Sequence, residues 1–311
     1  MSVFHAELAA AIGRASGTPF TVRDVRAMRG GDISEAFTLS DGVRMFFVKT
    51  QPAPRPPAGR ASGGVPLAGA VTRIEMFEAE AAGLAELAAA NAVRVPQVIC
   101  HGVAAGQEYL VLEHLPLQPH GDAAQLGRRL AQQHRVSAAQ FGGPRDNWIG
   151  ATPQPNAWMD GWVEFWRARR LGFQLKLAAQ NGYGGALQRD GEALMARLDG
   201  FFTGYRPAPS LLHGDLWGGN HGFLADGSPV IFDPAVYFGD RECDLAMSEL
   251  FGGFAPPFYA AYREAWPLDA GYAVRRTLYN LYHILNHANL FGGGYAAQAQ
   301  RMLAQLLAEI R

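Results

Sequence analysis

Short apolar runs separated by turn residues characterise the chain from about residue 20 to residue 115. Alternating or β-branched runs of this length are typical of strands. Five strands are predicted, at VRDVRAMRGGD (22–32), AFTLSDG (36–42), VRMFFVKT (43–50), VRVPQVICHG (93–102) and QEYLVLEHL (107–115). The second and third are expected to join at Asp41-Gly42, a common hairpin dipeptide. The Ala-, Leu- and Glu-rich segment 76–91 predicts one helix within this region.

Helical periodicity dominates after residue 115. Helices are predicted at residues 123–138, 156–180, 191–202, 273–290 and 296–311. We expect one interruption, a loop and a small hairpin between residues 211 and 233, with Asp226-Gly227 at the hairpin turn. The pattern therefore predicts an α+β fold of two lobes with a cleft between them. The small N-terminal lobe comprises residues 1–115, and the larger, mostly helical C-terminal lobe comprises residues 116–311.

Two terminal and connecting segments carry different signals. Residues 1–17 lack a basic start followed by a continuous apolar segment, so they predict a short amphipathic helix and no signal peptide. The Pro-, Gly- and Ala-rich segment 52–69 predicts a connection with little structure of its own.

Composition narrows the class of protein. The formal net charge of the 311 residues is −1, which removes the electrostatic reason to expect a nucleic acid or an anionic membrane as partner. The sequence contains no apolar run near the roughly 20 residues that span a bilayer. Cys100 and Cys243 lack metal-ligand spacing and indicate free thiols in a reducing, cytoplasmic compartment.

The strongest chemical signal is the block LLHGDLWGGN (211–220), followed by IFD at 231–233. Asp215 in a loop and Asn220 five residues later can face one pocket, with Asp233 after the next apolar run. Phosphoryl transfer needs an acid that orients and accepts the proton of a hydroxyl, and oxygen ligands for magnesium. The alternative is structural: Asp215 caps a turn, Asn220 adopts a left-handed loop conformation, and Asp233 caps a helix.

The upstream lobe offers partners for this block. Gly30 and Gly31, in a turn that runs to Ser34, have backbone N–H groups that could approach phosphate oxygens. Lys49 ends the run MFFVK and could bind phosphate if a helix glutamate held it. The candidates are Glu75, Glu78, Glu80 and Glu86. A plain hairpin turn, a solvated lysine and solvated glutamates remain the alternatives.

The run VLEHL, which ends the last strand of the small lobe, predicts the linker between the lobes. Adenine is expected to contact backbone groups there, namely the carbonyl of Glu113 and the N–H of Leu115. The side chain of Glu113 could equally be an exposed linker charge.

Longer blocks resemble a known family. LLHGDLWGGN, IFDPAVYFGDRECDLAMSELFGGF and LYHILNHANLFGGGY are similar to the fructosamine kinases, or ketosamine 3-kinases, which are relatives of aminoglycoside and choline kinases with a protein-kinase-like fold. The similarity extends from about Gly30 to the C-terminus. It implies ATP-dependent phosphorylation of the 3-hydroxyl of fructosamine, ribulosamine or erythrulosamine adducts. The phosphorylated adduct breaks down and frees the amine, which is a form of deglycation.

The resemblance also implies residue roles. Asp215 matches the catalytic base, and Asn220 and Asp233 match the magnesium ligands. Lys49 matches the phosphate-binding lysine, and Glu80 matches its helix partner. Trp217 and His287 match positions that resemble the sugar-amine pocket, with core packing and an internal helix histidine as the respective alternatives.

One departure concerns assembly. Family members often carry a cysteine in the Gly-rich loop, used for redox control and covalent dimers, whereas this chain has Asp32 there. A monomer is therefore expected, with a weak dimer as the alternative. Two other functions stay open: a phosphotransferase for another hydroxyl, such as an aminoglycoside, choline or homoserine, and a non-catalytic nucleotide-binding protein.

Overall fold

The computed structural model describes residues 2–28, 34–53 and 74–310. The chain forms two compact units, one of residues 1–86 and 96–116 and the other of residues 87–95 and 117–311. Segment 87–95 thus groups with the second unit, whereas the sequence-based boundary placed it in the first. Gly30, Gly31 and most of the Pro-rich segment lie outside the described residues.

The first unit is built on a five-stranded antiparallel sheet within the described residues, in the order β1-β2-β3-β5-β4. Its strands are β1 (Asp24–Met28), β2 (Glu35–Ser40), β3 (Met45–Pro52), β4 (Val98–Ala104) and β5 (Gln107–Glu113). At the β2–β3 turn the Asp41 carboxylate accepts hydrogen bonds from the N–H groups of Val43 and Arg44, at 3.0 and 2.7 Å. The five predicted strands and this turn are therefore present, although the first strand prediction runs into residues outside the described ones and the fourth strand begins at Val98 instead of Val93.

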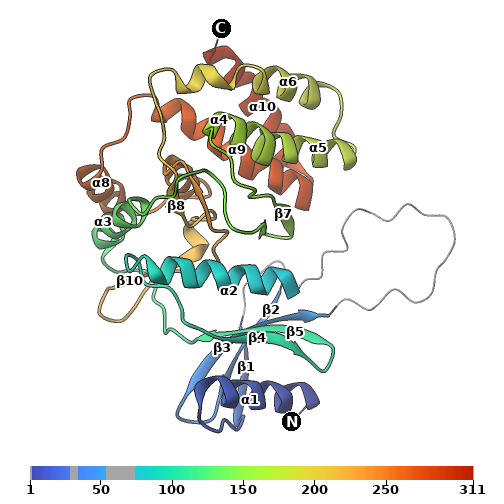
Figure 1. The fold of residues 1–311 in the computed structure, drawn as a ribbon, viewed down its shortest axis with the longest axis vertical. Coiled ribbons are helices and arrows are strands. Elements are labelled where there is room, and N and C mark those ends of the chain that lie inside the picture. The colour runs from blue at the N-terminus through green and yellow to red at the C-terminus, as the bar shows by residue number, and fades with distance from the viewer. Residues whose placement is uncertain (1, 29–33, 54–73, 311) are drawn as a thin grey trace, which may run out of the picture. The chain divides into compact units, whose positions relative to one another are not determined.

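Two helices cover opposite faces of this sheet (Figure 1), α1 (Val3–Ser16) and α2 (Ile74–Ala89). Leu8 and Ile12 of α1 pack into one hydrophobic cluster with Val48 of β3. Because neighbouring strand residues point to opposite faces, the burial of Val48 against α1 directs Lys49 to the other face. The alternation within MFFVK therefore decides on which face of the sheet the side chain of Lys49 lies.

The second unit is mostly helical, as predicted. Its α-helices are α3 (Ala123–His134), α4 (Trp162–Phe165), α5 (Gly172–Gln180), α6 (Ala186–Met195), α7 (Glu242–Glu249), α8 (Pro256–Ala265), α9 (Tyr272–Phe291) and α10 (Gly294–Glu309). The helix predicted over 156–180 begins only at Trp162, and its middle, Trp166–Leu171, is π-helical. Helices α7 and α8 are additions that the sequence pattern did not predict. Within the described chain, none of the helices is long and apolar enough to cross a membrane.

Among the described residues, three short two-stranded sheets interrupt the helices, where the sequence predicted one hairpin. The predicted hairpin is β9–β10 (His221–Phe223 and Pro229–Ile231), and Gly227 adopts a φ of 83° in its turn. The other pairs are β6–β7 (Asn147–Ile149 and Thr152–Gln154) and β8–β11 (Ser210–Leu212 and Tyr237–Gly239). Strands of three residues are too short for alternation to reveal them.

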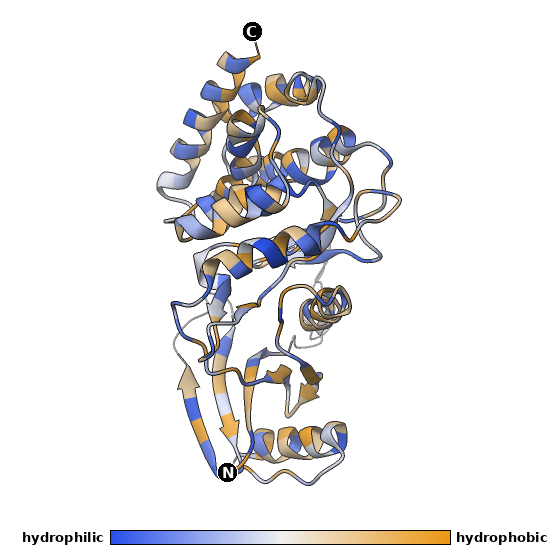
Figure 2. Cartoon of the chain, turned by 90° about the vertical axis from the view of Figure 1, so that its left-hand side faces the viewer, coloured by the Kyte–Doolittle hydropathy of each residue, from blue (hydrophilic) through white to orange (hydrophobic). Residues whose placement is uncertain are grey.

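An aromatic core holds the helices of the second unit together. Trp162 and Trp166 pack against Tyr279 of α9, with ring centroids 6.2 and 4.9 Å apart, and the Trp162 indole N–H donates to the Tyr279 hydroxyl at 3.1 Å. Figure 2 shows that these helices carry both hydrophobic and hydrophilic residues, as expected of helices with one face in the core and one in solvent. This packing supports the short strands that carry the candidate site.

The contact between α3 and α8 depends on a glycine. A Cβ on Gly127 would lie 2.2 Å from the backbone oxygen of Phe258. We expect Gly127→Ala to lower the free energy of unfolding by about 1–3 kcal/mol despite the better helix propensity of alanine, because the helices must separate. Chemical denaturation measures the difference. Gly184→Ala, whose Cβ would meet no atom within 4 Å, is the control; equal stability of the two variants contradicts this interpretation.

Candidate functional site

The loop that carries Asp215 leaves the buried strand β8 in a tight conformation. Gly214 adopts a φ of 84°, and a Cβ there would lie 2.0 Å from the backbone oxygen of Ala235. Any other residue at 214 would collide with backbone and not with a movable side chain. The Gly of HGD is therefore required by a close approach of two chain segments.

Asp244 of α7 holds the backbone of this loop by hydrogen bonds. Its carboxylate accepts hydrogen bonds from the backbone N–H groups of His213 and Gly214 at 2.7 and 2.8 Å, and lies 3.1 Å from Nε2 of His134. Burial would raise the pKa of Asp244, but hydrogen bonding and charge from His134 outweigh it and lower that pKa. The charged form is thus stable inside the protein and holds the two residues before Asp215.

Asp215, Asn220 and Asp233 come together as the sequence predicted. Nδ2 of Asn220 lies 2.9 Å from the backbone oxygen of Asp215, 3.2 Å from its carboxylate Oδ2 and 3.5 Å from the backbone oxygen of Asp233. Because all three partners are acceptors, they define the orientation of the amide, so that Oδ1 is the atom that could coordinate a metal ion. Asp233 lies two residues beyond β10 with a φ of 57°, a left-handed conformation that aspartate tolerates.

The environment of Asp215 raises its pKa to about 7, mainly through burial and then through the negative charge of Asp233, against the opposing hydrogen bond from Asn220. A carboxylate with a pKa near neutrality is suited to general-base work. The repulsion between two close carboxylates also makes the site favourable for a cation.

The donor set can be tested against magnesium. Among the described residues no group of three or more His, Cys, Asp or Glu side chains forms a metal cage. Mg²⁺ does not need one, since it commonly takes one or two carboxylates and completes its octahedron with phosphates and water. The Asp233 carboxylate and the Asn220 amide oxygen are hard oxygen donors of the kind that fits this ion.

In the first unit, Lys49 and Glu80 form an ion pair with Nζ and Oε1 2.7 Å apart. The two side chains are only 12% and 16% exposed, so the pair is neither the solvated lysine nor the solvated glutamate of the alternative interpretation. Of the other candidates in α2, Glu78 is exposed, and burial raises the pKa of Glu86. The structure thus selects Glu80 from the glutamates whose side chains it describes.

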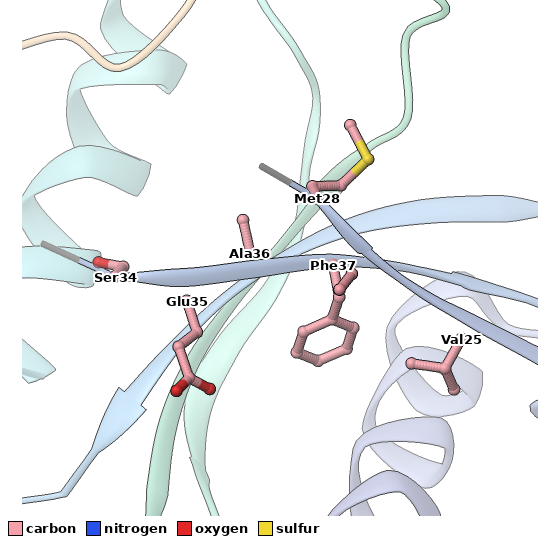
Figure 3. A pocket seen from close by; sticks show the side chains of 7 residues that line it. Val25, Met28, Ser34, Glu35, Ala36 and Phe37 are labelled. Atoms are coloured by element: carbon pink, nitrogen blue, oxygen red, sulfur yellow. The ribbon is translucent and has the colours of Figure 1, made fainter. Parts of the chain in front are cut away.

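The remaining candidates of the first unit lie at strand ends. Ser34 lies at the start of β2 beside a depression of about 430 Å³ (Figure 3). Met28 and Ala36 point to one side of this part of the sheet, and the register pairs Ala36 with Lys49. Glu113 ends β5, where Oε2 accepts a hydrogen bond from the N–H of Gln97 at 3.2 Å, and Leu115 follows two residues later, half-buried.

Trp217 and His287 belong to one aromatic cluster. The exposed ring of Phe251 lies between them, with centroids 6.4 Å from Trp217 and 4.8 Å from His287. His287 Nδ1 lies 2.8 Å from the carbonyl of His283. Trp217 is itself 38% exposed, so core packing does not explain it. Its indole lies over Gly219, where a Cβ would come within 2.3 Å of the ring.

Sequence reasoning missed Asp244 and Phe251. Phe251 has a φ of 55°, which is rare for a bulky residue and often marks a functional constraint. Asp244, within ECDLAMSE, and Phe251, before Gly252, were visible in the sequence, but no local pattern linked either residue to the loop at 211–220.

The two units carry the elements of the protein-kinase-like fold. A crystal structure of the aminoglycoside phosphotransferase APH(4)-Ia aligns with a TM-score of 0.57 at 15% identity, over 97% of this chain and 98% of the other. That likeness concerns the fold alone. The class defined by this likeness is therefore the protein-kinase-like fold.

The sequence comparisons define the family. A family model described as fructosamine kinase matches residues 65–309, and the chain belongs to this family. A Synechocystis protein assigned as a probable ketoamine kinase is 44% identical over 303 residues, covering 96% of both chains. The chloroplastic protein-ribulosamine 3-kinase of Arabidopsis thaliana is 37% identical, over 94% of this chain and 85% of its own. A crystal structure of a Haemophilus somnus protein assigned as a fructosamine-3-kinase aligns with a TM-score of 0.83 at 28% identity, over 96% of both chains.

The raised pKa of Asp215 has a consequence for stability. The folded state holds this proton with a pKa of about 7 against an ordinary 3.8, so ionising the carboxyl costs stability progressively as the pH rises between these values. We expect Asp215→Asn, measured by denaturation in EDTA, to be more stable than the parent protein by a few kcal/mol above neutral pH and by much less near pH 4.

Asp226→Asn is the matched control for this measurement. Hydrogen bonds from Ser228 lower the pKa of Asp226, so replacing the Asp226 carboxylate with an amide has no such stabilising effect at high pH. A stability difference for Asp215→Asn that does not change with pH contradicts the assigned environment.

Proposed function

We propose that this protein is an ATP-dependent kinase that phosphorylates the 3-hydroxyl of ketosamines and so initiates their deglycation. The observation that supports this most directly is that the side-chain amide of Asn220 contacts both Asp215 and Asp233. The names of the relatives, ketoamine kinase and protein-ribulosamine 3-kinase, supply the acceptor class. In this proposal the first unit binds nucleotide phosphates, and the second carries catalysis and acceptor binding.

Asp215 acts on the acceptor hydroxyl. Its carboxylate accepts a hydrogen bond from the 3-hydroxyl and takes the proton as the oxygen attacks the γ-phosphorus. The new bond is the O–P bond of the sugar phosphate, and the bond that breaks joins the γ-phosphorus to the oxygen that leaves with ADP. Asp244 contributes by holding the backbone on the N-terminal side of Asp215, which keeps the base oriented.

Lys49 and the metal ligands act on the nucleotide. Lys49 neutralises phosphate charge, and the ion pair with Glu80 holds its ammonium group in place. Asn220 and Asp233 are the residues that would hold Mg²⁺, which when bound neutralises charge on the phosphate oxygens. Glu113 and Leu115 contribute backbone groups to adenine, and Gly30, Gly31 and Ser34 contribute to phosphate binding.

The aromatic cluster of Trp217, Phe251 and His287 is the proposed contact for the sugar-amine part of the acceptor. Exposed aromatic faces bind the apolar faces of sugars and attract cationic amines. Trp217 lies two residues after Asp215 in the chain and therefore connects acceptor binding to the base. The absence of a cysteine in the Gly-rich loop supports a monomer.

The role of Asp215 is tested by removing its carboxylate. We expect Asp215→Ala to lower kcat by about 100-fold or more while ATP still binds, because the base acts on the hydroxyl. ADP release with ribulosamine, erythrulosamine and fructosamine adducts of free and protein-bound lysine measures the loss. A panel containing an aminoglycoside, choline and homoserine is the comparison. Normal turnover by Asp215→Ala overturns the assignment, and faster turnover of a panel member than of every ketosamine overturns the acceptor class.

The acceptor role of Trp217 is tested through the glycine beneath it. In Gly219→Ala the new methyl group displaces the indole, so we expect KM for the ketosamine to rise about 3- to 10-fold while KM for ATP is unchanged. Gly218→Ala is the matched control, since a Cβ there meets nothing within 4 Å. Equal acceptor KM values for the two variants remove Trp217 from the proposed acceptor site.

A further inference from the structure

The backbone around Asp233 is hydrogen-bonded from two sides. On one side, the carbonyl of His213 accepts from the N–H of Ala235 at 2.8 Å, and Nε2 of His213 lies 2.9 Å from the carbonyl of Phe232. The catalytic loop therefore holds the segment from that direction. The other direction is occupied by side chains of the β6–β7 hairpin, to which the mechanism assigns no role.

Two buried amides of this hairpin donate to the same segment. Nδ2 of Asn147 donates to the carbonyl of Val236 at 2.7 Å, and Nε2 of Gln154 donates to the carbonyl of Ala235 at 3.2 Å. Asn147 and Gln154 are 7% and 0% exposed, so water does not replace them. They act as a clamp on the two residues that separate Pro234 from β11.

The clamp is itself held in one orientation. Oδ1 of Asn147 accepts from Gln154 at 2.8 Å and from Nδ2 of Asn156 at 3.0 Å. The Tyr282 hydroxyl donates to Oε1 of Gln154 at 2.8 Å, and Nη2 of Arg170 donates to Oδ1 of Asn156 at 2.7 Å. Each of these three amide oxygens thus accepts from a donor, which excludes flipped alternatives for all three amides.

The conformation of Asp233 gives the clamp a purpose. Its φ of 57° lies in the left-handed region, which persists at a non-glycine residue when the surrounding contacts over-determine it. The fixed φ of Pro234 transmits the direction of the following backbone to Asp233. We propose that Asn147 and Gln154 are positioning residues, which preset the Asp233 carboxylate for the metal–nucleotide complex. This inference rests on the metal role of Asp233 in the proposed function.

The test compares metal binding with nucleotide binding. The variants are Asn147→Ala and Gln154→Met, the second of which keeps the side-chain volume and serves alone if the first does not fold. Electron paramagnetic resonance measures binding of Mn²⁺ in the presence of ADP, and calorimetry in EDTA measures binding of ADP without metal. We expect Mn²⁺ affinity to fall about 10-fold or more, as it does when residues that orient metal ligands are removed. Metal-free ADP affinity should stay within about 2-fold, because neither residue has a nucleotide role.

Gln188→Met is the matched control. Its amide also donates to two backbone carbonyls, those of Leu175 and Tyr183 at 3.0 and 2.9 Å, but in the α5–α6 region. We expect parental Mn²⁺ affinity for this variant. An equal loss in Gln188→Met, or an equal loss of metal-free ADP binding in the clamp variants, shows a merely structural role and overturns the inference.

The variant Asp233→Ala distinguishes the positioning role of Asn147 and Gln154 from the metal role of Asp233. If Asp233→Ala weakens Mn²⁺ binding while Asn147→Ala and Gln154→Met do not, the positioning role is wrong and the proposed function stands. If Asp233→Ala binds Mn²⁺ with parental affinity, the metal role of Asp233 is wrong and the positioning inference fails with it.

Discussion

The geometry of the loop that carries Asp215 depends on the hydrogen bonds of one buried carboxylate, that of Asp244. It joins α7 to the backbone N–H groups of His213 and Gly214 and to the imidazole of His134 in α3. A buried carboxylate that lost these donors would carry the full cost of its desolvation, so the contacts form together or not at all. The conformation of the loop is therefore coupled to the packing of two helices that contain none of the proposed catalytic residues.

A second constraint acts on the segment that carries Asp233. Gly214 and Ala235 approach so closely that a Cβ is excluded, and the amides of Asn147 and Gln154 hold the other side of the segment. Two carboxylates are thereby kept near each other although they repel, and this repulsion adds to burial, the main cause, in raising the pKa of Asp215. A cation bound beside these carboxylates would relieve this repulsion.

Local patterns predicted much of the architecture. The alternation in MFFVK placed Lys49 on the face opposite Val48, and the hairpin dipeptides at residues 41–42 and 226–227 lie at the two turns where they were expected. The predictions were weaker in the second unit. Helices α7 and α8 were missed. The pairs β6–β7 and β8–β11 were also missed, because strands of three residues carry no measurable period. The helix expected over 156–180 was predicted too long because apolar spacing continues through its non-helical start.

The sequence by itself determined the family, the strands of the first unit and the grouping of Asp215 with Asn220, because five residues of loop bring such neighbours together in almost any fold. The resemblance already implied that Glu80 is the partner of Lys49, and the tertiary structure forms that ion pair. Only the tertiary structure decided that Phe251 connects Trp217 to His287 and that Asp244 holds the loop. These contacts join residues about 30 or more positions apart. Their partners depend on which helix faces pack together, a choice made by the burial of the whole core and not by any local propensity.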